Sequence, residues 1–287
     1  MTWPRHETEV AVTAPAKINW YLYVVGRRPD GYHDIVSLMT PLTLADQVRI
    51  CYKPTDTKRW LRCPKRPDLE GPHNLALRAV RWWEKHVEPI PGGLDILLTK
   101  HVPTGAGLGG GSADAAAVLR SLCRLSGRQS LHLQTLCDLG CDVPFCLASK
   151  AALVTGRGEH LSPIERLPEL DLCIVWPGFE IHSEWAYSQS RPTRLPDADT
   201  DHLSRIGDND LWTAAVEKYP MLAKVRNDLK KLGAKATGMT GSGSALFGSF
   251  ESQTAAGQAA SRFRDRGFWA TRTQTRPVAD WSPACSA

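Results

Sequence analysis

The chain has 287 residues, which at roughly 150 residues per domain favours two domains, and its 42% hydrophobic and 23% charged residues are typical of a globular protein and argue against disorder. No apolar run approaches the roughly 18 residues of a membrane-spanning helix, and Glu7 and Glu9 stand where a signal peptide would have its apolar core, so we expect a cytoplasmic protein without a membrane partner. The net charge of +5 would suit nucleic acid or a phosphorylated ligand.

The first half of the chain is predicted to contain a mixture of strands and helices. Segments rich in β-branched and aromatic residues predict strands, with Pro15 interrupting the first two. Apolar residues spaced by three or four positions predict the first helix. In chain order we expect strands at 9–14 and 17–25, a turn at 27–33, an extended stretch at 35–50, a helix at 74–87, a strand at 94–99, a glycine loop at 105–111, helices at 112–125 and 131–139, and a strand around Leu153.

The second half of the chain continues the same mixture after a proline-flanked bridge at 162–168. We place the domain boundary in that bridge, giving domains 1–165 and 166–287. The expected elements are a strand at 172–176, a polar loop at 188–202, a helix at 221–232, a second glycine loop at 238–244, a strand at 245–250 and a helix at 254–266. The predicted fold class is α+β or mixed α/β.

Eight cysteines are too few for a disulfide scaffold in a chain of this length, and none forms a CxxC pair. Cys137 and Cys141 are four positions apart, at the end of the predicted helix at 131–139, and would share one helix face. Cys146 is nearby in the sequence. Because no histidine or second cysteine pair stands at ligand spacing, we favour buried reduced thiols over a zinc site.

The segment 51–86 carries nine basic and four acidic residues, which is a net charge of +5. Trp60, Trp82 and Trp83 lie among these charges, so a nucleic-acid patch is one interpretation. A solvated hairpin and helix face is the other, and we favour it because no nucleic-acid module signature accompanies the charge.

A strand, a glycine run and a helix start follow one another in LLTKHVPTGAGLGGGSADAAAVL. Glycines let a ligand approach the backbone, and the helix adds unsatisfied N–H groups and the positive end of its dipole. Ser112 could cap that helix or offer its hydroxyl to a phosphate or Mg²⁺. The lysine of a Walker A loop is missing. GAGLGG fits the GxGxxG pattern of a dinucleotide-binding fold, but the acidic residue that such a fold has about 20 positions later is absent. We therefore predict a phosphate-binding loop, against the alternative of a tightly packed turn.

Three motifs in the expected order resemble those of the GHMP kinases, a superfamily of small-molecule kinases. PTGAGLGGGSADAA resembles their phosphate-binding motif, APAKINWYLYV at 14–24 their N-terminal motif, and GMTGSGSALFG at 238–248 their C-terminal glycine loop. Within the superfamily, GRRPDGYHDIVS at 26–37, NLALRA at 74–79, GCDVPFC at 140–146 and GRGE at 156–159 are similar to the members that act on a cytidine diphosphate conjugate of methylerythritol.

The resemblance implies a fold, a reaction and partners. The fold would be a two-domain α+β kinase with an N-terminal ATP-binding domain like ribosomal protein S5 domain 2, a ferredoxin-like C-terminal domain, and the site between them. The reaction would be ATP- and Mg²⁺-dependent phosphorylation of the 2-hydroxyl of that conjugate in non-mevalonate isoprenoid biosynthesis, by a monomer or homodimer that binds no nucleic acid. A kinase for mevalonate or homoserine, and a basic nucleic-acid-binding protein, are the alternatives.

The resemblance assigns catalysis to Lys17 and Asp142. Asp142 would accept the proton of the attacking hydroxyl, whereas composition alone favours a turn-forming aspartate before Pro144. Lys17 would stabilise charge on the transferring group, against the alternative of a lysine at a strand edge with its amine in water. The residues expected to bind ATP are Pro103, Gly105, Gly107, Gly109, Gly110, Gly111, Ser112, Asn74 and Lys100.

The expected substrate-binding residues are Asn19, Tyr32, His33, Ser183 and Tyr187. Asn19 shares a strand face with Lys17 and would meet the erythritol hydroxyls. Tyr32 and His33 resemble a pair that recognises cytosine, one by its ring plane and the other by hydrogen bonding, and Ser183 and Tyr187 align with a family hydroxyl and a base-stacking aromatic. Ala113 stands where the family often has a second serine.

Overall fold

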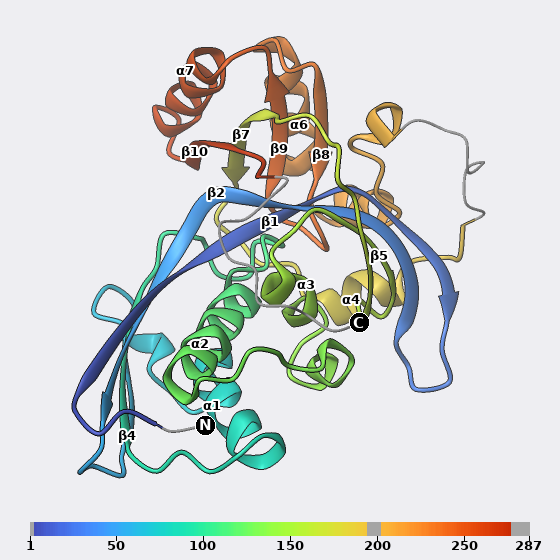
Figure 1. Ribbon diagram of the computed structural model, residues 1–287. Helices are drawn as coiled ribbons and strands as arrows, with labels where there is room; N and C mark the ends of the chain where they lie inside the picture. The colour runs from blue at the N-terminus through green and yellow to red at the C-terminus, as the bar shows by residue number, and fades with distance from the viewer. Residues whose placement is uncertain (1–2, 194–201, 277–287) are drawn as a thin grey trace.

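A long antiparallel hairpin arches across the middle of the molecule (Figure 1). The structure, a computed structural model, describes residues 3–193 and 202–276. The hairpin consists of β1 (Thr8–Arg27) and β2 (His33–Lys53), and the Pro-Asp-Gly turn joins them. The two strands predicted on either side of Pro15 are thus one strand. The proline is accommodated at a register shift between Pro15 and Lys17, because a bulge removes the need for a ladder N–H there.

Both ends of β2 carry further strands, so that the first sheet has six strands. The first half of β2 pairs with β5 (Ala152–Gly156), which pairs in turn with β6 (His160–Pro163). The second half pairs with β4 (Gly93–Thr99), and β3 (Arg59–Arg62) joins β4 in parallel. Residues 59–62 of the basic segment therefore form an edge strand rather than part of a hairpin, whereas the helix expected at the end of this segment is present.

Three helices cover one face of this sheet, below the hairpin in Figure 1. They are α1 (Leu75–His86), α2 (Gly110–Ser126) and α3 (Val143–Ala148). The alanine-rich α2 is buried along most of its length, because small side chains let it lie close to both the sheet and α1. Trp83 and Phe145 are among the largest side chains in the resulting core.

The second sheet has the strand order β10-β7-β9-β8 and is antiparallel throughout. Its strands are β7 (Asp171–Trp176), β8 (Ala236–Met239), β9 (Leu246–Phe250) and β10 (Trp269–Gln274), with α6 (Met221–Lys231) between β7 and β8 and α7 (Gln253–Arg264) between β9 and β10. This is the β-α-β-β-α-β order of a ferredoxin-like unit. Two short helices, α4 (Ser183–Ser188) and α5 (Trp212–Lys218), are inserted after β7.

A shared core cluster joins the two sheets. Trp20, Tyr21 and Leu38 of the hairpin pack with Ile174 of β7 and Phe247 of β9, and all five are nearly fully buried. The chain crosses from the first sheet to the second over residues 164–170. Because this cluster spans the crossing, the division into domains 1–165 and 166–287 stays a prediction.

Several local predictions were wrong. The helix expected at 131–139 is a short 3₁₀-helix, Leu133–Asp138, so Cys141 lies beyond it and shares no helical face with Cys137. The start of the polar loop expected at 188–202 is the end of α4, and residues 194–201 lie outside the described residues. Two other 3₁₀-helices, Pro67–Leu69 and His202–Arg205, were not foreseen.

Two arginines of the basic segment form ion pairs. Arg59 pairs with Glu84 at 2.7 Å, and Arg62 pairs at 2.8 Å with Asp95, which lies outside the segment and offsets one of its excess positive charges. Seven cysteines in the described residues are free thiols. No helix in the described ranges is long and apolar enough to cross a membrane.

Candidate active site

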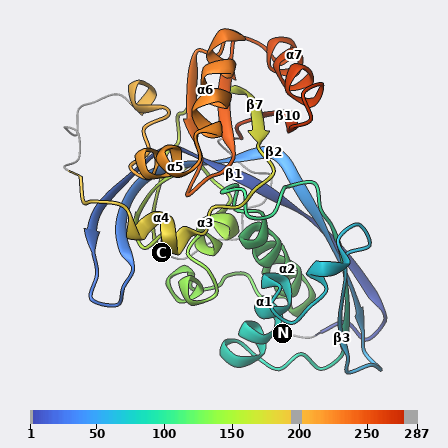
Figure 2. The ribbon, with the colours of Figure 1, turned by 180° about the vertical axis from the view of Figure 1, so that it is seen from behind.

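A cavity of about 790 Å³ opens where the hairpin, the glycine loop and the start of α4 meet. Helices α3 and α4 lie side by side at this place in both ribbon views (Figures 1 and 2). The predicted residues that line the cavity come from five separate segments of the chain. They are Lys17, Asn19, Tyr32, His33, Gly107, Ser112, Asp142, Ser183 and Tyr187.

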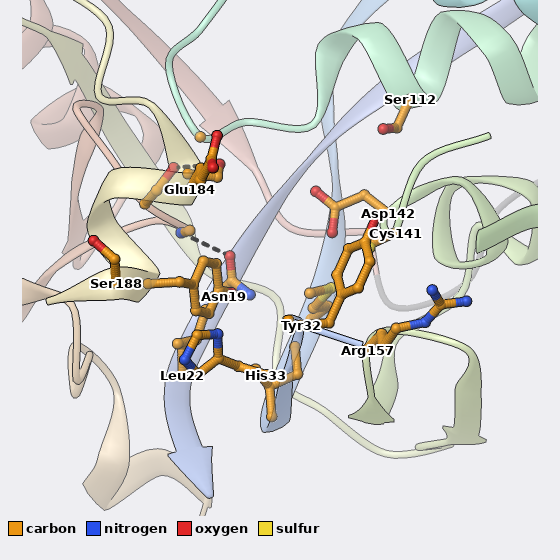
Figure 3. Close-up of a pocket in the computed structure, with 18 of the residues that line it drawn as sticks. Asn19, Leu22, Tyr32, His33, Ser112, Cys141, Asp142, Arg157, Glu184 and Ser188 are labelled. Carbon is orange, nitrogen blue, oxygen red and sulfur yellow. Dashed lines mark hydrogen bonds between the residues drawn. The ribbon is translucent and has the colours of Figure 1, made fainter. Parts of the chain in front are cut away.

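The two predicted catalytic residues form an ion pair in this cavity. Lys17 Nζ lies 3.3 Å from Asp142 Oδ2, and the side chains are 3% and 30% exposed, respectively. Asp142 directly precedes α3 but makes no side-chain cap hydrogen bond, which leaves its carboxylate directed into the cavity (Figure 3). The register shift beside Lys17 and the bond from its N–H to the carbonyl of Leu108 fix this part of β1 against the glycine loop.

Asn19 connects the hairpin to the second sheet. Its Oδ1 accepts hydrogen bonds from Lys17 Nζ at 2.9 Å, from the Gly241 N–H at 2.8 Å and from Thr240 Oγ1 at 3.2 Å. Its Nδ2 donates to Ser37 Oγ at 2.8 Å. The amide is thus engaged in orienting Lys17 and the second glycine loop, and its contact with a substrate hydroxyl stays a prediction.

The two glycine loops touch. Gly107 has a φ of +78°, and a Cβ on it would lie 2.2 Å from the Thr240 carbonyl oxygen. On Gly109 a Cβ would lie 2.9 Å from Lys17 Cγ. The Ala245 N–H donates to the Ala106 carbonyl at 3.0 Å. Glycine is therefore required in the first loop for the approach of protein atoms as well as of any ligand.

The sequence suggested that Ser112 could cap α2, but Ser112 is not the cap residue of this helix. The helix begins at Gly110, and the N-cap is Gly109 in the left-handed conformation. Ser112 instead lies within the first turn, where its side chain lines the cavity. A hydroxyl at this place is available to a ligand beside the N-terminal N–H groups of the helix. Pro103, Gly105 and Gly109 of the loop and Gly110 and Gly111 of the first turn of α2 do not line the cavity.

Asn74 and Lys100 also lie outside the cavity lining. Asn74 caps α1, since its Oδ1 accepts from the Ala76 N–H at 2.8 Å. Lys100 is buried in contact with two carboxylates, Asp114 at 2.7 Å and Asp46. Asp114 stands on the first turns of α2. Burial raises the pKa of Asp114, the Lys100 ammonium lowers it and the Asp46 carboxylate raises it, which together give a pKa of about 7.

An aromatic group closes the other end of the cavity. The rings of His33 and Tyr187 are stacked, with centroids 5.5 Å apart and planes at 24°, while Tyr32 is 47% exposed. Burial, with a smaller contribution from Arg27, lowers the pKa of His33, which favours the neutral imidazole. Ser183 Oγ lies 3.0 Å from Ser242 Oγ and so links α4 to the second glycine loop.

Sequence reasoning missed several residues of the site. Arg157, Cys141 and Glu184 line the cavity, and Asp46 and Asp114 hold Lys100. Arg157 lies within the GRGE motif and Cys141 within the GCDVPFC motif, so the sequence held a usable signal for both. Asp46 and Asp114 had no such signal, because a buried ion pair depends on which elements meet. No cluster of three or more metal-ligating His, Cys, Asp or Glu side chains is found among the described residues.

Comparison with known proteins matches both parts of the chain. The GHMP kinases N terminal domain matches residues 74–151, and the GHMP kinases C terminal model matches residues 201–267. A 4-diphosphocytidyl-2-C-methyl-D-erythritol kinase of Citrifermentans bemidjiense is 34% identical, covering 93% of this chain and 99% of the relative. One of Anaeromyxobacter dehalogenans is 39% identical, covering 88% and 84%.

Solved structures agree with the sequence relatives. A crystal structure of 4-(cytidine 5'-diphospho)-2C-methyl-D-erythritol kinase has a TM-score of 0.79 at 35% identity, covering 93% of this chain and 99% of the other. A homoserine kinase from Cytophaga hutchinsonii has a TM-score of 0.69 at 20% identity, covering 96% and 97%, which shows a shared fold alone. The predicted two-domain α+β kinase fold is confirmed. The chain belongs to the GHMP kinases and, within them, to the family of the 4-diphosphocytidyl-2-C-methyl-D-erythritol kinases.

Proposed function

We propose that the chain transfers the γ-phosphoryl group of ATP to the 2-hydroxyl of 4-diphosphocytidyl-2-C-methyl-D-erythritol, a step of non-mevalonate isoprenoid biosynthesis. The observation that carries the proposal is the position of the Lys17–Asp142 pair, 3.3 Å apart, between a glycine loop and an aromatic group in one cavity. A phosphate donor and a base-containing acceptor would meet at that pair.

Each part of the reaction has a residue in position to perform it. The N–H groups of the glycine loop and of the first turn of α2 would receive the phosphates. As the hydroxyl oxygen bonds to the γ-phosphorus, the bond from that phosphorus to the β–γ bridging oxygen breaks, and the hydroxyl proton passes to an Asp142 oxygen. Lys17 Nζ supplies positive charge beside the transferring group.

The donor atoms at this place suit Mg²⁺. This ion takes oxygen ligands and often uses only one or two protein groups together with substrate phosphates. The Ser112 hydroxyl lines the cavity and would be the protein group available to the ion beside the phosphates. When bound, Mg²⁺ neutralises charge on the phosphates. Its use stays part of the proposal.

The aromatic group fits the other end of the substrate. Tyr32 offers an exposed ring plane, and His33 and Tyr187 offer a second stacked surface. A neutral pyrimidine gains from stacking on such rings and from hydrogen bonds to an imidazole. Mevalonate and homoserine have no base to fill this end of the cavity.

A coupled assay of ADP release tests the proposal. The purified chain is given ATP with 4-diphosphocytidyl-2-C-methyl-D-erythritol, mevalonate or homoserine, each at several concentrations. We expect turnover of the cytidyl compound alone, and phosphorus NMR of the product should show the new ester on the 2-hydroxyl. Turnover of mevalonate or homoserine without turnover of the cytidyl compound would refute the proposal. A cytoplasmic location, a monomeric or dimeric state and the lack of a nucleic-acid partner stay predictions.

A further inference from the structure

Arg157 lies against the ring that the proposed function assigns to the base. It stands in the turn between β5 and β6, and its guanidinium carbon is 4.8 Å from the centroid of the Tyr32 ring. Figure 3 shows Arg157 and Tyr32 next to each other, below Cys141 and Asp142. Both side chains line the cavity. A cation at this distance from an aromatic face is attracted to it.

The turn that carries Arg157 is held firmly in place. The Glu159 carboxylate accepts a hydrogen bond from the Arg157 N–H, and the guanidinium reaches Asp138 at 3.4 Å. Gly158 has a φ of +128°, and a Cβ on it would lie 2.4 Å from the Cys141 carbonyl oxygen. The turn is thus packed against the residue that precedes Asp142.

Tyr32, by contrast, stands at the exposed tip of the hairpin. Its N–H is bonded to Asp30 at 3.1 Å and its carbonyl accepts from Arg28, so the backbone is fixed, but the ring is 47% exposed. An exposed ring must lose rotational freedom before a base can stack on it. A cation held on one face reduces that loss and leaves the other face for a ligand.

We propose that Arg157 is a positioning residue for base recognition: it holds the Tyr32 ring from behind, so that the opposite face receives the pyrimidine. The proposal rests on the proposed function. It extends that function by giving the GRGE turn a role in substrate selection. The competing role for Arg157 is a direct charge interaction with the substrate's diphosphate.

Two ligands separate these roles. Binding of cytidine and of cytidine 5'-diphosphate is measured by titration calorimetry for the wild type and for Arg157→Ala. Positioning of the ring predicts that both ligands weaken by the same factor, about 3- to 10-fold. A loss confined to the diphosphate, or no loss for either ligand, would overturn the proposal.

Variants and kinetics complete the test. Arg157→Lys keeps a cation and should recover part of the loss, while Arg166→Ala changes the charge equally at an exposed site and should change nothing. In a Tyr32→Leu background, Arg157→Ala should add no further loss, and an undiminished second loss contradicts the proposal.

Arg157→Ala should raise KM for the cytidyl substrate and leave KM for ATP unchanged. If the wild type turns that substrate over and Arg157→Ala leaves its KM unchanged, only this inference fails; if the wild type does not, the proposed function fails.

Discussion

Gly107→Ala should separate the two glycine loops and lower kcat. The added Cβ would lie 2.2 Å from the Thr240 carbonyl oxygen and 3.0 Å from that of Gly243. An ordinary carbon–oxygen contact is about 3.3 Å, so the backbones must move apart by about 1 Å. That movement stretches the bond from the Ala245 N–H to the Ala106 carbonyl and the one from Thr240 Oγ1 to the Gly107 carbonyl.

The expected magnitude has two parts. The left-handed backbone of residue 107, with φ of +78°, costs an alanine about 1 kcal/mol, and two weakened hydrogen bonds cost about 1 kcal/mol each. The sum of about 3 kcal/mol corresponds to a fall in Tm of roughly 5 °C for a chain of this length. Because the same loops contact Lys17 and, in the proposed function, receive the phosphates, a displacement of about 1 Å should lower kcat by about 10²-fold.

A second glycine separates the steric effect from the backbone effect. Gly127 also has a left-handed backbone, with φ of +71°, but a Cβ on it would meet no atom within 4 Å. Gly127→Ala should therefore lose only about 1 kcal/mol of stability and keep its kcat. The measurements are thermal unfolding by circular dichroism and steady-state kinetics. If Gly107→Ala keeps kcat within twofold and matches Gly127→Ala in Tm, the loops do not need the close approach, and the reasoning fails.

Three further predictions concern single carboxylates and rings. Asp142→Asn should lower kcat by about 10²-fold or more while the Kd for ATP stays the same; a kcat near that of the wild type would exclude Asp142 as the proton acceptor. Tyr32→Ala should raise KM for the cytidyl substrate by about 10-fold, and a rise in KM for ATP alone would contradict its placement. Because the pKa of Asp114 is raised to about 7 in the folded chain, the folded state binds this proton more tightly than the unfolded state, and stability falls as the pH rises from about 4 to 7. Asp114→Asn should flatten this fall in urea unfolding measured at pH 5 and pH 8, and an unchanged pH dependence would show that Asp114 does not cause it.

Motifs predicted the site better than periodicity predicted the fold. Lys17 and Asp142 were identified from two short motifs far apart in the sequence, and the structure brings them within 3.3 Å of each other. The glycine loop was readable because five of its seven residues, 105–111, are glycine and the following helix is strongly patterned. Such signals are local, so one sequence is sufficient to find them.

Features that depend on tertiary neighbours could not be read in this way. The strand β3 is a short parallel edge strand whose basic residues suggested a solvated surface, and only its pairing with β4 defines it. The segment Leu133–Asp138 has the apolar spacing of an α-helix but forms a 3₁₀-helix. Lys100 was assigned to the nucleotide, yet Asp46 and Asp114 meet it from other elements.

The shared cluster around Trp20 and Phe247 affects how the chain can be divided. The hairpin supplies apolar side chains to both sheets, so a cut within residues 164–170 would leave each fragment with a large apolar surface in contact with water. At roughly 25 cal/mol per Å² of such surface, neither fragment would retain the few kcal/mol that keep a small domain folded. The two fragments should then be insoluble when produced separately and recover activity only when co-expressed. The chain would unfold in a single transition.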